Sequence, residues 1–154
     1  MAQKRIQLLA IMPEQWLTSL TDALADLPVN ILTAQNWQSA RSALIKSPEI
    51  EVVLVASLLP DATWKEVVAH VSDLQSPPWI IVAARFSDAS LWYDVLENGA
   101  YDLTVYPFRP EALIHVIVSA SADCRQGRER TDRAAKGYPT REQNATAELG
   151  RYDE

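Results

Sequence analysis

The sequence predicts an α/β protein: an open, doubly wound sheet of five parallel strands in the order 2-1-3-4-5, flanked by five helices. Short apolar runs alternate along the chain with segments of helical spacing, which is typical of repeated strand–helix units. Right-handed crossovers between parallel strands then place helices on both faces of the sheet. Three runs are almost entirely apolar, as expected of strands covered on both faces: 6–11, 52–56 and 79–84.

The other two predicted strands are more polar. Residues 29–33 and 102–105 mix apolar and polar side chains, as strands at the edge of a sheet do. The order 2-1-3-4-5 puts the three most apolar strands in the middle, and it is one of the common orders of doubly wound sheets.

Between the strands, apolar residues recur every three or four positions, which predicts amphipathic helices. One such stripe comprises Trp16, Leu17, Leu20, Ala23, Leu24 and Leu27, and another comprises Trp64, Val67, Val68 and Val71. Residues that favour helix starts precede the helical segments as N-caps, as a capping box or as a first-turn proline. These residues are Pro13, Asn36, Thr63, Asp88 and Pro110.

The composition divides the chain into a domain, 1–122, and a tail, 123–154. The domain carries the whole formal net charge of −6, whereas the tail balances its many acidic and basic residues. Large apolar residues are rare in the tail, so the tail alone cannot bury enough apolar surface to offset the conformational entropy that it would lose on folding. We expect a charged helical extension of the last domain helix or a disordered linker.

Several classes of protein are excluded or disfavoured. No apolar run approaches the roughly 18 residues of a membrane-spanning helix. The one cysteine, Cys124, forms no internal disulfide framework and fits a reducing cytoplasm. His70 and His115 lie far apart in the sequence, which argues against a zinc site. The acidic domain disfavours nucleic-acid binding.

Three segments resemble the receiver domain of response regulators, the CheY-like fold of bacterial two-component signalling. The most specific is ENGAYDLTVYPFRPEAL at 97–113, and the others are VVLVASLLPD at 52–61 and PWIIVAAR at 78–85. They follow the family's order and spacing, and the resemblance covers about residues 4–122. Gly99, the only glycine of the domain, falls just after the fourth helix, where a left-handed cap is expected.

The resemblance also implies where the phosphorylation residues should lie. Receivers hold Mg²⁺ with an acidic pair after strand 1 and are phosphorylated on an aspartate that ends strand 3. They also use a Ser/Thr after strand 4, a lysine in strand 5 and an aromatic switch residue in strand 5. The matching positions here are Ala10 and Ile11, then Ala56, Ala83, Tyr106 and Leu103.

These replacements predict a pseudo-receiver that has lost phosphorylation. An alanine methyl group cannot act as the nucleophile that forms an acyl phosphate. Mg²⁺ needs hard oxygen ligands, which Ala10, Ile11 and Ala56 do not supply. Tyr106 carries a phenol, which is never positively charged and so supplies no cation. Glu14, Asp61 and Asp88 lie on nearby loops and are expected to be turn or cap residues.

A surface for a partner is expected on the fourth helix, the fifth strand and the fifth helix, because this face docks partners in the family. The apolar arc of the fifth helix is wider than one packing face requires, so part of it should contact a partner or a second copy. The expected contact residues are Trp92, Leu103, Ile114, Val116 and Val118. Alternatively, these residues only fill the core.

The sequence therefore predicts a non-enzymatic signalling module of a two-component or phosphorelay system, without cofactor or metal, acting through a protein partner or as a homodimer. The alternative is a flavodoxin-like protein that binds a small ligand at the switch point of the sheet. The loop at 11–15 has no glycine to cradle a phosphate, and this absence disfavours the flavodoxin-like alternative. A third hypothesis, nucleic-acid binding through the basic residues of the tail, is weakened by interspersed acidic residues.

Overall fold

The structure, a computed structural model, describes residues 5–135 and has the predicted doubly wound architecture. Its parallel strands pair in the order β2-β1-β3-β4-β5, which confirms the predicted order, and the two more polar strands are the edges. The strands are β1 (Ile6–Ile11), β2 (Val29–Ala34), β3 (Val52–Ala56), β4 (Trp79–Ala84) and β5 (Asp102–Val105).

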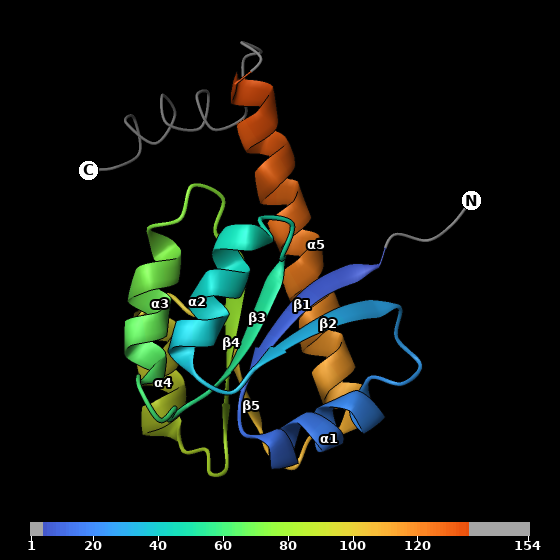
Figure 1. Cartoon of the computed structure of the whole chain (residues 1–154), viewed down its shortest axis with the longest axis vertical. Helices are drawn as coiled ribbons and strands as arrows, with labels where there is room; N and C mark the ends of the chain where they lie inside the picture. The colour runs from blue at the N-terminus through green and yellow to red at the C-terminus, as the bar shows by residue number, and fades with distance from the viewer. Residues whose placement is uncertain (1–4, 136–154) are drawn as a thin grey trace.

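Five helices cover the sheet in two layers. Figure 1 shows α1 and α5 together on one face and α2, α3 and α4 on the other. The helices are α1 (Glu14–Ala23), α2 (Trp37–Lys46), α3 (Trp64–Ser72), α4 (Ala89–Glu97) and α5 (Pro110–Ala135). All five residues of β3 are buried, as expected of a central strand covered on both faces.

The helices begin at the predicted capping residues, except that one of these residues lies one position earlier than expected relative to its helix. The side chain of Asn36 accepts from the N–H of Ser39 at 2.8 Å, and that of Asp88 accepts from the N–H of Leu91 at 2.7 Å. Thr63 caps α3 in the same way, and Pro110 is the first residue of α5. Pro13, expected inside the first turn of α1, is instead its N-cap residue.

Gly99 ends α4 in the left-handed conformation predicted for it. Its φ is +92°, and the N–H of Ala100 donates to the carbonyl of Val95 at 3.2 Å. This bond closes a Schellman motif, which turns the chain from α4 into β5.

The compositional boundary after Ala122 lies within an unbroken helix. α5 is 26 residues long and continues to Ala135, and Figure 1 shows its last turns projecting past the sheet. Of the expected tail, residues 123–135 are thus helical, and Cys124 is buried against the domain. Residues 136–154 lie outside the described part of the chain.

In the described part, 5–135, no helix combines the length and the apolarity needed to cross a bilayer.

Candidate functional site

The carboxyl-terminal edge of the sheet, where the receiver resemblance places phosphorylation, is lined by buried hydrocarbon. Ala10, Ile11 and Ala83 are fully buried and Ala56 is 2% exposed. Ala56 and Ala83 are register partners on β3 and β4, so two of the expected positions lie side by side. These four side chains carry neither a nucleophile nor an oxygen ligand, so they cannot perform receiver chemistry.

An aromatic cluster contains the position of the receiver lysine. The ring of Tyr106, just after β5, stacks on that of Trp16 of α1, with centroids 4.3 Å apart and planes 3° from parallel. Phe108 meets both rings edge-on, with centroids 6.4 Å from Trp16 and 5.5 Å from Tyr106. Stacked and edge-to-face pairs are favourable geometries for aromatic rings. An aromatic contact between α1 and the β5–α5 loop thus stands where a cation is expected in a receiver.

The carboxylates near this edge have structural roles. Asp61 accepts hydrogen bonds from the backbone N–H groups of Trp37 at 2.8 Å and Gln38 at 3.0 Å. The bond from Trp37 is the main cause that lowers the pKa of the Asp61 carboxyl. Asp88 caps α4, and Glu14 lies in the first turn of α1. Among residues 5–135, no three His, Cys, Asp or Glu side chains are grouped closely enough to hold a metal ion.

The predicted partner surface is partly exposed. Trp92 is 49% exposed and Val118 is 42% exposed, whereas Leu103 and Ile114 are half-buried and pack against the core. Two of these elements, α4 and β5, also carry exposed apolar side chains that were not predicted: Tyr93, Leu96 and Val105.

Val116 does not belong to this surface. It is 8% exposed and belongs to the core, so its prediction as a partner contact is wrong for the chain in this conformation. The physical reason is that α5 packs against α1 as well as against the sheet. A helix held between a sheet and another helix needs a wider apolar arc than a helix on a sheet alone.

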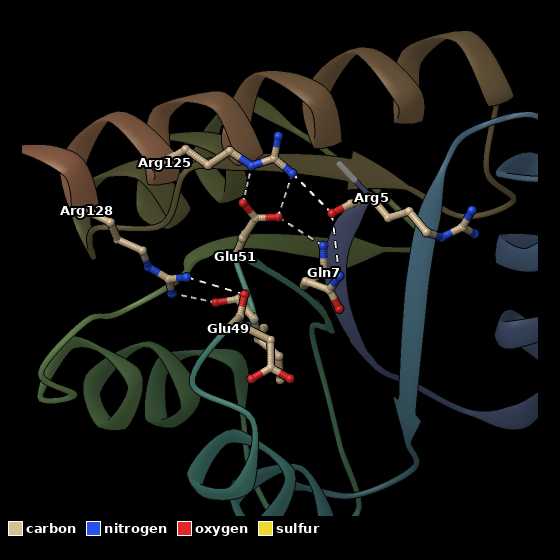
Figure 2. Close-up of polar contacts among 7 residues, drawn as sticks. Arg5, Gln7, Glu49, Glu51, Arg125 and Arg128 are labelled. Carbon is tan, nitrogen blue, oxygen red and sulfur yellow. Dashed lines mark hydrogen bonds and ion pairs between the residues drawn. The ribbon is translucent and has the colours of Figure 1, made fainter. Parts of the chain in front are cut away.

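Two arginines that the sequence assigned to the tail fasten α5 to the amino-terminal edge of the sheet. Figure 2 shows the Arg125 guanidinium facing the Glu51 carboxylate, which directly precedes β3. Nε of Arg125 donates to Oε2 of Glu51, and Nη2 donates to Oε1 at 3.0 Å. The N–H of Gln7 also donates to Glu51 at 3.0 Å. The bond with Glu51 raises the pKa of Arg125, so this guanidinium stays charged.

Arg128, one turn further on, binds backbone instead of a carboxylate. Its Nη2 donates to the carbonyls of Ile50 at 2.6 Å and Ser76 at 3.1 Å, and its Nη1 donates to that of Glu49 at 3.4 Å. Glu49 and Ile50 precede β3, and Ser76 precedes β4. Arg128 therefore joins α5 to two loops (Figure 2 shows the bonds to the first).

Sequence reasoning missed this contact, although two signals were present. Glu51 is a single carboxylate directly before an apolar run, where its burial demands a charged or hydrogen-bonding partner. Arg125 and Arg128 continue the helical spacing of the buried residues Leu113, Ile117, Ala120 and Cys124. Together these signals predict that the domain face of the helix extends past Ala122.

Solved structures to which the chain is similar include receiver domains of response regulators. The chain is similar to the signal receiver domain of an HD domain-containing protein from Pseudomonas fluorescens Pf-5, with 21% identity and a TM-score of 0.72 over 84% of this chain and 96% of that one. It is also similar to a response regulator receiver domain protein from Clostridium thermocellum, at 14% identity and a TM-score of 0.70 over 80% and 98%. A response regulator from Thermotoga maritima is similar with 18% identity and a TM-score of 0.69, over 77% of this chain and 99% of that one.

No protein-family model matches the sequence, and no curated protein matches it. The likeness therefore rests on three-dimensional structure and establishes the receiver fold.

Proposed function

We propose that the chain is a pseudo-receiver, a receiver-like signalling module that works by protein–protein contact and not by phosphorylation. The observation that carries the proposal is the buried alanine pair, Ala56 and Ala83, at the edge of the sheet where the resemblance places the phosphoacceptor. In the receiver resemblance this edge binds Mg²⁺ and a phosphoryl group, and here it presents hydrocarbon and stacked aromatic rings.

The working surface in this proposal is the face formed by α4, β5 and α5. It is supported by the exposure of Trp92, Tyr93 and Val118, because exposed apolar surface is typical of interaction sites. The state of such a module is set by a partner that binds one conformation better than another. A cytoplasmic location is part of the proposal, since Cys124 is a free thiol, which a reducing compartment preserves.

The alternative, a ligand-binding crevice of the flavodoxin type at the switch point, gains no support from this edge. The residues that follow β1 and end β3 would line it, and Ile11, Met12 and Ala56 are buried among other apolar groups.

Phosphorylation is tested directly with acetyl phosphate and Mg²⁺, followed by intact-mass spectrometry. We expect no phosphoryl adduct on the chain, because no carboxylate is present at the acceptor position. A receiver with its full set of acidic residues, treated in parallel, should show a stoichiometric adduct. The same adduct on this chain would overturn the proposal.

The partner surface is tested by molar mass in solution, with Trp92→Glu plus Val118→Glu. If a second copy is the partner, the unaltered chain is expected to be a dimer and the double variant a monomer. Ile45→Glu on α2 is the matched control, because Ile45 is 68% exposed on a different helix and should leave the mass unchanged. A dimer that survives the double variant but not the control would locate the interface on another face.

A further inference from the structure

A cleft lies at the amino-terminal edge of the sheet, opposite the edge discussed above. It has a volume of about 570 Å³ and is bounded by α3, the α3–β4 loop, the start of β4 and the continuation of α5. Ligand pockets commonly have volumes of roughly 300–1,000 Å³. Its apolar lining includes Val68 and Val71 of α3, and Trp79 and Ile80 of β4. Trp79 is 39% exposed, so an entering molecule can reach its indole ring.

The side of the cleft formed by α5 is positively charged. Arg128 and Arg130 both line it, together with one carboxylate, Asp123, which accepts a hydrogen bond from the hydroxyl of Tyr101 at 2.7 Å. Among the side chains that the structure describes, those of 5–130, neither arginine forms an ion pair. The Nε of Arg128 is buried without a hydrogen-bond partner, while backbone carbonyls hold the rest of its guanidinium in place. The local charge is thus net positive on a chain whose net charge is −6.

Gly127 supplies an independent observation. It lines the cleft from inside a helix, where glycine is less favourable than every residue except proline. A Cβ atom added there would meet nothing within 4 Å, and the backbone has no positive φ that requires glycine. The space beside Gly127 is thus open to a molecule that lies against the helix at this point.

We propose that this cleft binds a small amphipathic anion, a compound with a flat apolar body and one carboxylate or similar group. The apolar body would lie on the exposed ring of Trp79, and the anion would face the exposed Arg130, with the positive charge of Arg128 beside it. A guanidinium group is suited to a carboxylate because it donates charge-assisted hydrogen bonds in a planar array. The proposal does not depend on the loss of phosphorylation, since the two sites lie at opposite edges of the sheet.

The test uses the ¹⁵N-labelled full chain, titrated with 2-naphthoate and followed by two-dimensional NMR. We expect saturable shifts of the Gly99 and Gly127 amides and of the Trp79 indole N–H, all of which belong to residues that line the cleft. The neutral analogue 2-naphthamide should bind about tenfold more weakly, because it lacks the charge that faces the arginines. Equal affinity for the two probes, or shifts confined to Trp92 and its neighbours, would overturn the proposal.

Variants separate the cleft from the rest of the surface. Gly127→Leu fills the cleft from α5 and should weaken naphthoate binding by about tenfold or more, whereas Gly127→Ala should change it by less than about twofold. Arg130→Gln should weaken naphthoate binding but leave naphthamide binding unchanged. Both glycine variants should fold, since the space beside Gly127 is open. Undiminished binding to a folded Gly127→Leu chain would contradict the proposal, as would an equal loss of both probes in Arg130→Gln.

Discussion

Arg125→Met is expected to lower the free energy of unfolding by about 2 kcal/mol. The substitution removes the cation that faces Glu51, whose side chain is only 3% exposed, and a buried carboxylate that loses its charged partner is strongly destabilised. The expected loss of unfolding free energy is smaller than is usual when a buried ion pair is broken, because the Arg125 side chain is 31% exposed and partly screened by water. Urea unfolding, followed by tryptophan fluorescence, measures the loss.

Two further variants separate the charge effect from a loss of packing. Arg130→Met, on the exposed side of the same helix, should change stability by less than about 0.5 kcal/mol. Glu51→Leu combined with Arg125→Met should restore most of the unfolding free energy that Arg125→Met loses. With both charges removed, no buried carboxylate is left without its cation. Amide exchange in residues 123–128 should accelerate in Arg125→Met, since this segment is fastened through the pair. Equal stability of Arg125→Met and the unaltered chain would show that the contact does not hold α5.

The fold was predictable from the sequence because each element carries its own local signal. The unbroken apolar runs at 52–56 and 79–84 indicate strands buried on both faces, and they coincide with β3 and β4. Gly99 marks the end of α4 because the left-handed backbone there favours glycine. Each of these signals acts over a few residues, so it can be read before any tertiary contact is known.

The positions that the resemblance assigns to phosphorylation stay a prediction, and they rest on a different kind of signal. Ala56 and Ala83 are fixed by their distance from sequence motifs, and the register of β3 with β4 pairs them directly. The stacking of Tyr106 on Trp16 could not be read in the same way, because it joins residues about 90 positions apart in the sequence. Only the shared edge of the sheet brings them together.

A helical extension after Ala122 was one of the two forms expected for the tail, but its contacts with the sheet were not predicted, because composition reports an average. Residues 123–154 are charged on average, yet Cys124, Arg125 and Arg128 lie on the side of α5 that contacts the sheet. The pairing of Arg125 with Glu51 spans 74 positions, so local patterns suggest that each residue has a partner but do not show which residue that partner is. The burial of Val116 was missed for a related reason, since it depends on α1 packing against α5.

Ala56→Asp, which restores only the missing carboxylate, is expected to destabilise the chain by about 3 kcal/mol and to accept no phosphoryl group. Ala56 is 2% exposed and its register partner, Ala83, is fully buried, so the new carboxylate would lie among apolar groups with no cation or metal ligand beside it. Desolvation would raise the pKa of the new aspartate above its unfolded value of about 3.9. Intact mass after treatment with acetyl phosphate and Mg²⁺ shows whether the variant accepts a phosphoryl group.

The raised pKa of the new aspartate determines how the stability of Ala56→Asp changes with pH. The destabilisation should be smaller below about pH 3, where the carboxyl is largely protonated in both states, and should grow as the pH rises and unfolding releases a proton. Ala56→Asn is the matched control, because it adds a polar group of similar size whose cost should not change with pH over this range. If Ala56→Asp were instead stabilised by Mg²⁺ and labelled by acetyl phosphate, this edge of the sheet would retain the remainder of a receiver site, and the pseudo-receiver proposal would be wrong.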